Sequence, residues 1–116
     1  MIKLIPLNNP CQCQSCKGIH TVIYQPGDCE AIVQCEKCGQ LWYSLLFERM
    51  SFAGGADTLE EYQIPINAPE YQQIIDTEYQ NLNIKFLAGR KARVLHEGGI
   101  VEIESDLALS RCGRSQ

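Results

Sequence analysis

The hydrophobic residues of the first half gather in three short segments separated by turn residues. Residues 19–24 are rich in β-branched and aromatic side chains, residues 31–34 repeat that character, and residues 40–47 are the most apolar of the three. A Pro-Gly pair at positions 26–27 is typical of a tight turn, because proline fixes φ and glycine accepts a positive φ. The pattern predicts three strands. Apolar residues at the consecutive positions 45–47 indicate that the third strand is covered on both faces.

The second half begins with a short strand and an amphipathic helix. Residues 62–66 alternate in polarity and predict a strand, with Pro65 at a sheet edge or at the end of the strand. Asn67 followed by Glu70 three places on is typical of a helix start. Beyond it, apolar residues recur at helical spacing and predict one helix from about 68 to 87. The residues of this stripe are Tyr71, Ile74, Ile75, Tyr79, Leu82 and Phe86.

Two further segments rich in apolar residues stand on either side of a Glu-Gly-Gly sequence. Residues 93–96 and 100–104 flank this turn, and the alternation of the second places Glu102 and Glu104 on the solvent face. Paired apolar segments around a glycine-rich turn predict a β-hairpin.

Four of the seven cysteines stand in two C-x-x-C pairs separated by 18 residues. These are Cys13, Cys16, Cys35 and Cys38. The spacing is that of a zinc site, since a tight turn sets two sulfurs on one side of the backbone and each pair supplies half of a tetrahedron. A glycine follows each pair within two residues and can take the positive φ that such a turn needs. Four thiolates fill the coordination shell of zinc, so the expected role of one Zn²⁺ is structural.

Other uses of the cysteines are less consistent with the pattern. Cys11 forms C-x-C-x-x-C with the first pair and could replace Cys13 as a ligand. An odd number of cysteines argues against a disulfide framework, and two pairs with strands between them do not match a redox C-x-x-C at a helix start. Unless it replaces Cys13, Cys11 is expected to be a bystander near the site. Cys29 is expected to be a core or surface thiol, and Cys112 lies in a polar tail.

Residues 11–48, about a third of the chain, resemble the zinc-ribbon superfamily through these four cysteines. The resemblance implies three short strands around one ion, and it leaves the function open, because such scaffolds serve many functions. With the second half, it predicts an α+β fold. A three-stranded zinc ribbon with a lead-in (residues 1–50) continues into a lobe of β-hairpin, helix and β-hairpin (residues 51–116), and the two pack as one compact unit.

The net charge of −4 is unevenly distributed along the chain. Residues 1–50 are neutral, residues 51–84 carry six acids and no base, and residues 85–116 carry six bases against four acids. A nucleic-acid-binding protein is expected to show a concentrated basic face instead. No apolar run approaches the length of a membrane span, and the broken N-terminal segment does not match a secretory signal. We therefore expect a cytoplasmic protein.

One stretch, residues 85–93, is basic. It contains Lys85, Arg90, Lys91 and Arg93, and Lys17 and Lys37 on the cysteine turns could add to it. These side chains could contact phosphates or an acidic partner. They could equally lie at a helix end and pair with the acidic residues 57–78.

The sequence contains no recognisable catalytic motif. A phosphate loop, a nucleophile elbow and the metalloprotease H-E-x-x-H are all missing. His20 and His96 are expected to be ordinary strand residues. Of the aromatic residues Trp42, Tyr43 and Phe47, which could stack on bases, at least half are expected in the core.

These features together favour a protein-recognition module over an enzyme. An acidic surface at 57–78 would meet a basic partner, as in an antitoxin or immunity-type protein that masks a basic nuclease. The alternative is a nucleic-acid-binding zinc ribbon that uses the Lys85–Arg93 cluster.

Overall fold

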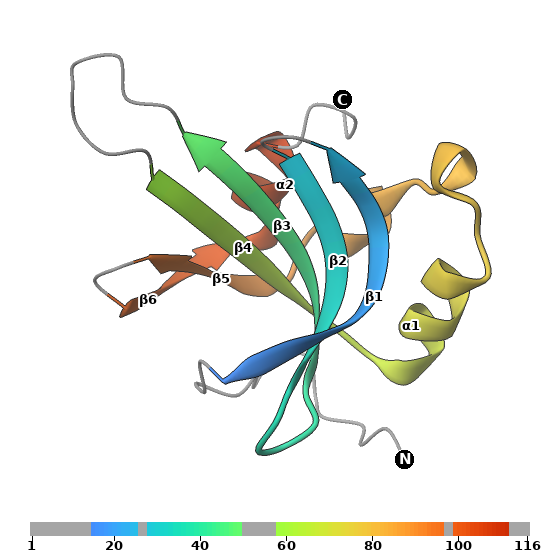
Figure 1. Cartoon of the computed structure of the whole chain (residues 1–116), viewed down its shortest axis with the longest axis horizontal. Coiled ribbons are helices and arrows are strands. Elements are labelled where there is room, and N and C mark those ends of the chain that lie inside the picture. Colours follow the sequence, from blue (N-terminus) through green and yellow to red (C-terminus); the bar gives the residue numbers. More distant parts are fainter. Residues whose placement is uncertain (1–14, 26–27, 50–57, 97–98, 112–116) are drawn as a thin grey trace.

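Six strands form one antiparallel sheet in which each strand pairs with the next along the chain (Figure 1). The computed structural model describes residues 15–25, 28–49, 58–96 and 99–111. The strands of the first half are confirmed, and the predicted turn at 26–27 lies outside the described residues. The six strands are β1 (Cys16–Gln25), β2 (Asp28–Cys35), β3 (Leu41–Arg49), β4 (Thr58–Ile66), β5 (Lys91–His96) and β6 (Gly99–Glu104).

The predicted α+β class is wrong, because the described part of the chain is mainly β. Strand β3 pairs with β2 on one side and, from Leu41 to Arg49, with β4 on the other. The three strands expected to form a ribbon with a lobe packed on it therefore belong to one sheet with the strands of the second half. Strand β4 is internal, and Pro65 lies near its end, beyond the segment Glu61–Gln63 that pairs with β5.

The single helix predicted over 68–87 is also wrong, although its start is confirmed. Helix α1 (Ala68–Ile75) begins with a capping box in which the Asn67 side chain accepts from the Glu70 N–H at 2.9 Å and Glu70 accepts from the Asn67 N–H at 3.0 Å. It ends early, and two short 3-10 turns follow, η1 (Tyr79–Asn81) and η2 (Ile84–Leu87). A polar side chain caps the second of these turns: Asn83 accepts from the Lys85 N–H at 2.9 Å.

The predicted hairpin is confirmed as β5 and β6, but the helix after it was not predicted. Helix α2 (Ser105–Arg111) starts directly at the end of β6. The Ser105 N–H donates to the Arg90 carbonyl, the Ser105 hydroxyl accepts from the Arg90 N–H, and Asp106 accepts from the Gly89 N–H. These bonds fix α2 against the segment that leads into β5.

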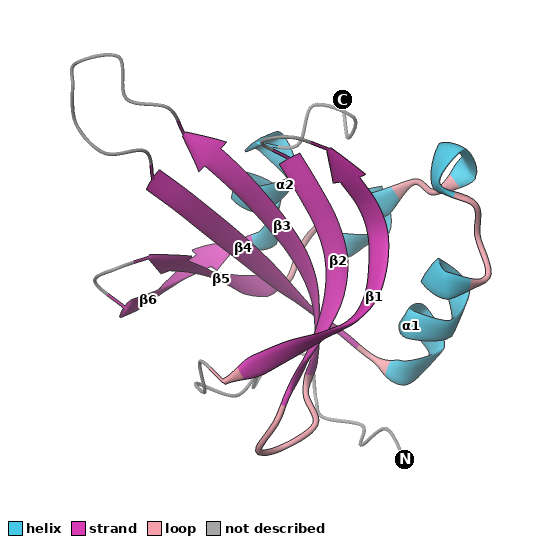
Figure 2. Cartoon of the chain, viewed as in Figure 1, coloured by secondary structure: helices cyan, strands magenta, loops and turns pink. Residues whose placement is uncertain are grey.

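The main core lies between one face of the sheet and the helical segments (Figure 2). Tyr43, Leu45 and Ile64 from the sheet are fully buried there. The predicted apolar stripe of 71–86 is buried or half-buried although its backbone is not one helix. Residues of the helical segments in this core are Ile74, Leu82, Ile84, Leu87, Ala108 and Leu109.

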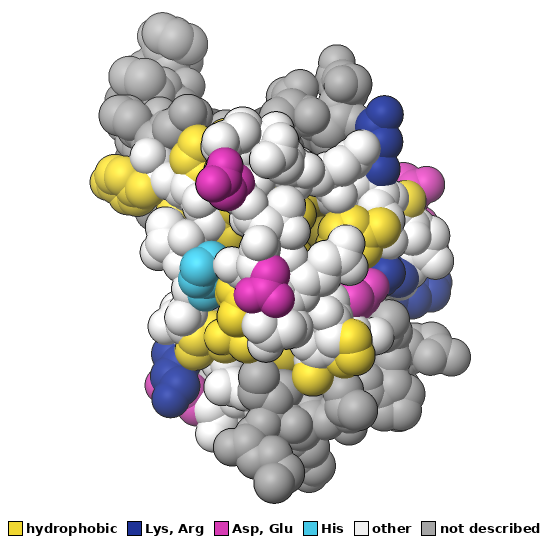
Figure 3. All heavy atoms as spheres, turned by 90° about the vertical axis from the view of Figure 1, so that its right-hand side faces the viewer, with side chains coloured by type: hydrophobic (Ala, Val, Ile, Leu, Met, Phe, Trp, Pro, Cys, Tyr) yellow, Lys and Arg dark blue, Asp and Glu magenta, His cyan; other side chains and the backbone are white. Residues whose placement is uncertain are grey.

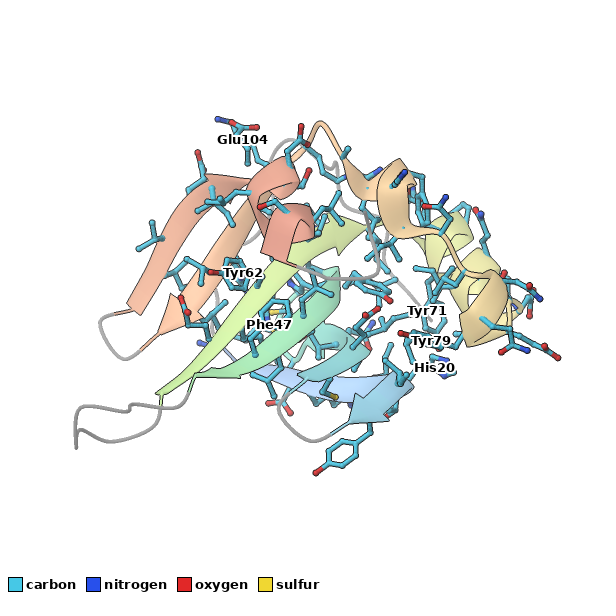
Figure 4. All side chains as sticks on the ribbon, turned by 90° about the horizontal axis from the view of Figure 1, so that it is seen from above. His20, Phe47, Tyr62, Tyr71, Tyr79 and Glu104 are labelled. Atoms are coloured by element: carbon cyan, nitrogen blue, oxygen red, sulfur yellow. The ribbon has the colours of Figure 1, made fainter. Side chains whose placement is uncertain are left out.

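The opposite face of the sheet is buried around the middle of β3. Trp42 and Ser44 alternate with the core residues of β3, and they are also buried. The prediction that the third strand is covered on both faces is therefore confirmed. Of the three aromatic residues, Trp42 and Tyr43 are buried and Phe47 is half-buried beside Tyr62, with ring centroids 5.6 Å apart (Figure 4).

Candidate metal centre

Two of the predicted zinc ligands face each other across the first hairpin. Cys16 is the first residue of β1 and Cys35 is the last residue of β2, and they are antiparallel partners. Directly opposite residues in an antiparallel pair carry their side chains on the same face, with Cβ atoms about 4.5–5.5 Å apart. The strand register therefore brings one cysteine of each C-x-x-C pair to the same place.

The backbone after β2 forms the turn that the second C-x-x-C pair requires. The Gly39 N–H donates to the Cys35 carbonyl at 3.0 Å, and Gly39 has φ of 83°, in the region that glycine tolerates best. Within this turn the Lys37 N–H donates to the Cys35 sulfur at 3.4 Å. Such a bond stabilises negative charge on sulfur, which a metal-bound thiolate carries.

Arg93 of β5 lies against the sulfur of Cys16. Its Nη2 is 3.6 Å from the Cys16 Sγ, its Nε donates to the Gln63 side chain at 2.8 Å, and its guanidinium carbon lies 3.9 Å from the centre of the Trp42 ring. Arg93 is only 3% exposed. The site therefore includes a buried positive charge from the far half of the sheet.

A hydrogen-bonded chain continues from Arg93 across β4 and β3. The Gln63 amide donates to Glu61 Oε2 at 2.7 Å, and the Ser44 hydroxyl donates to the same oxygen at 2.7 Å. Gln63 and Ser44 are buried. The face of the sheet that carries Cys16 and Cys35 thus contains an ordered polar network, and sequence reasoning did not find it.

Without a metal, the environment of Cys16 favours the neutral thiol. Burial raises the pKa of Cys16 to about 11, while the positive charge of Arg93 acts in the opposite direction, and Cys35 and Glu61 raise the pKa further. A coordinating metal ion deprotonates a thiol outright, so metal binding would reverse this preference.

Three of the four predicted zinc ligands, Cys16, Cys35 and Cys38, are among the described residues. Cys13 lies outside them, as do Cys11 and Cys112, and within the described ranges no group of three or more His, Cys, Asp or Glu side chains could hold a metal ion. Of the cysteines that the structure describes, none is in a disulfide. Cys16 and Cys35 are cross-strand partners whose sulfur is a donor that zinc prefers, but the described Cys38 is not grouped with them into a site of three ligands.

The six basic residues predicted as contacts lie on five separate segments: β1, the turn after β2, η2, the connection before β5, and β5 itself. Arg90 makes an internal ion pair with Glu70 through two bonds of 3.0 Å and also donates to the carbonyls of Pro65 and Phe86. Lys91 is exposed and pairs with Glu102 and Glu104, and the hydrogen bond to Glu104 raises its pKa. The remaining three, Lys17, Lys37 and Lys85, are exposed.

The acidic residues of 57–78 are also divided between roles. Glu70 pairs with Arg90 and Glu61 belongs to the polar network, whereas Asp76 and Glu78 are exposed. On the face drawn in Figure 3, acidic and basic side chains are scattered among polar and apolar ones. Asp57 lies outside the described residues.

The two histidines, both expected to be strand residues, lie in β1 and β5. His20 of β1 is half-buried, and Figure 4 draws it at the same end of the molecule as Tyr71 of α1 and Tyr79 of η1. His96 ends β5. No helix in the described ranges is long and apolar enough to cross a membrane.

Comparison with known proteins gives no family for the chain. No protein-family model, no curated protein and no solved structure matches it.

Proposed function

We propose that the chain binds one zinc ion through Cys13, Cys16, Cys35 and Cys38 and that the ion is structural. The observation that supports this most is the cross-strand pairing of Cys16 with Cys35, beside a turn whose Lys37 N–H donates to sulfur. Four thiolates would leave no coordination position for water or substrate, so the ion would stiffen the β1/β2 end of the sheet.

The proposed use of this stiffened sheet is recognition of another protein. Strand β1 forms one edge of the sheet, with β2 as its partner within it. Near its end, Tyr24 is 78% exposed, the highest value among the large hydrophobic side chains of the described residues. Exposed tyrosine is enriched at protein interfaces, since it offers a large apolar ring and a polar tip. Two irregularities in the β1 register favour side-chain contacts over addition of a further strand.

Nucleic-acid binding has less support from the geometry. Arg90 and Arg93 are the two arginines of the predicted basic cluster, and both make internal contacts. Lys91 pairs with two glutamates on the neighbouring strand. A continuous basic surface of the kind that phosphates require would have to come from other residues.

The metal proposal is tested by the zinc content of the purified chain and of two serine variants. We expect one zinc per chain in the wild type, loss of zinc in Cys35→Ser, and full retention in Cys29→Ser, which changes a half-buried cysteine six residues earlier on the same strand. Absence of zinc from wild type purified with zinc present, or equal loss in both variants, would contradict the proposal.

The recognition proposal is tested with a photo-crosslinking amino acid at position 24 in living cells. A matched control carries the same group at Gln80, an exposed position of η1. We expect a defined, nuclease-resistant protein adduct from position 24 and none from position 80. An adduct that nuclease removes would indicate the nucleic-acid alternative, and the same products at both positions would contradict specific recognition through β1.

A further inference from the structure

Arg93 occupies a position where a charged side chain is costly. It alternates along β5 with Ala92 and Val94, which face the main core, and it is itself 3% exposed on the opposite face. A buried charge persists where its hydrogen bonds and counter-charges are well placed. The groups that contact Arg93 therefore indicate the role of this position.

The contacts of Arg93 hold its guanidinium in one orientation. The Gln63 side chain accepts from Nε at 2.8 Å, and the Trp42 ring lies under the guanidinium carbon at 3.9 Å. Gln63 is itself held by Glu61. With Nε and the planar face fixed, Nη2 is directed at the Cys16 Sγ, 3.6 Å away.

The contact joins parts of the fold that are not neighbours in the sheet. Cys16 and Arg93 are 77 residues apart, and three strands separate β1 from β5 in the sheet order. The first part of β1 is paired with the end of β2, and Figure 1 draws it in front of the other strands. Arg93 thus links Cys16 of the first C-x-x-C pair to the β5/β6 hairpin.

We propose that Arg93 is an outer-sphere positioning residue of the thiolate metal site, and that it couples metal binding at Cys16 to the stability of the β5/β6 hairpin. The inference rests on the proposed zinc site. A zinc ion with four thiolates carries a net charge of about −2. A guanidinium bonded to one sulfur offsets part of that charge, and a charge-assisted bond is stronger than one to a neutral thiol.

Coupling of this kind must act in both directions. If the contact of Arg93 with Cys16 strengthens metal binding, metal binding stabilises that contact by the same factor. Zinc should then slow hydrogen exchange of amides in β5 and β6, although the cysteine ligands lie in the first half of the chain.

The test uses Arg93→Met, Arg93→Lys and the control Lys91→Met in the full chain. Lys91→Met removes a positive charge from an exposed position of the same strand. Zinc affinity is measured by competition with a chelator, and Co²⁺ replaces zinc for absorption spectra. We expect Arg93→Met to weaken zinc binding by about 10–100-fold and to shift the sulfur-to-cobalt band, Arg93→Lys to recover part of both, and Lys91→Met to change neither.

Wild-type affinity and spectrum in Arg93→Met would overturn the inference while leaving the zinc site in place. Failure of the wild type to bind zinc would instead overturn the site and the inference together. Should Arg93→Met not fold, exchange of the β5/β6 amides in the wild type, with and without zinc, decides the question. Equal exchange rates in the two states would refute the coupling.

Discussion

The buried pair of Tyr43 and Glu30 shows how single residues stabilise this sheet. The Tyr43 hydroxyl donates to Glu30 Oε1 at 2.6 Å, and the two residues are 0% and 2% exposed. They lie on β3 and β2 on the core face. A buried carboxylate depends on such donors, since water cannot replace them.

We expect Tyr43→Phe to lower the free energy of unfolding by about 1–3 kcal/mol, because a buried carboxyl acceptor loses a donor. Tyr62→Phe is the matched control, since its hydroxyl makes a longer bond of 3.3 Å to Glu60. Urea unfolding followed by fluorescence gives both values. A loss for Tyr43→Phe no larger than for the control would contradict the importance of the short bond.

The second prediction at the scale of residues concerns Arg90. Its guanidinium holds Glu70, Pro65 and Phe86 together, so α1, the end of β4 and η2 meet at one side chain. The Arg90 and Glu70 side chains are 14% and 17% exposed. We expect Arg90→Met to reduce stability by about 2–4 kcal/mol, because it leaves a largely buried carboxylate without its partner.

Lys91→Met provides the comparison for Arg90. The exposed fractions in the Lys91 pair with Glu102 are 51% and 64%, and such surface pairs contribute little. Thermal unfolding of the two variants should show a clear loss for Arg90→Met and almost none for Lys91→Met. Equal losses would indicate that Arg90 is no more than a surface ion pair.

At the scale of elements, local sequence signals predicted the strands and the start of α1 better than they predicted the length of that helix. Asn67 and Glu70 predict the start of α1 because a capping box needs only residues three apart. The apolar stripe to Phe86 is compatible both with one helix and with short turns packed on a sheet. The Asn83 side chain, which accepts from the Lys85 N–H at the start of η2, favours a new turn over a continued helix. Helix α2 depends on tertiary contacts with Gly89 and Arg90.

The capping box gives a prediction for α1. Asn67→Ala should lower the free energy of unfolding by about 1 kcal/mol, whereas Asn67→Gly should cost only a few tenths, because glycine tolerates the cap backbone and leaves it open to water. Chemical denaturation measures the two variants. If glycine were as damaging as alanine, the side-chain bond of 2.9 Å to the Glu70 N–H would not explain the helix start.

At the scale of the whole molecule, the continuity of the sheet was the main feature that sequence reasoning missed. The first hairpin was predicted, since that information is local, but Cys16 and Gly18, which were expected in a turn, lie within β1. The full-length pairing of β3 with β4, and the contact of Arg93 with Cys16, join residues far apart in sequence. No periodicity signals such contacts, so a ribbon with an α+β lobe packed on it was predicted where one sheet exists.

A continuous sheet predicts a single unfolding transition. Near-ultraviolet circular dichroism of Trp42 and far-ultraviolet signals of the strands should change together on heating, because β3 bonds to both halves. With zinc removed by a chelator, the common midpoint should fall while the two signals still coincide. Two separated transitions would show that residues before and after position 50 fold as independent units.

The central claim is that sulfur from both C-x-x-C pairs holds one zinc ion at the β1/β2 end of the sheet. X-ray absorption at the zinc edge of the purified chain tests this most directly, because it counts the ligand atoms and measures their distances. The account predicts four sulfur ligands at about 2.3 Å. A shell of nitrogen and oxygen ligands, or no bound zinc, would contradict it.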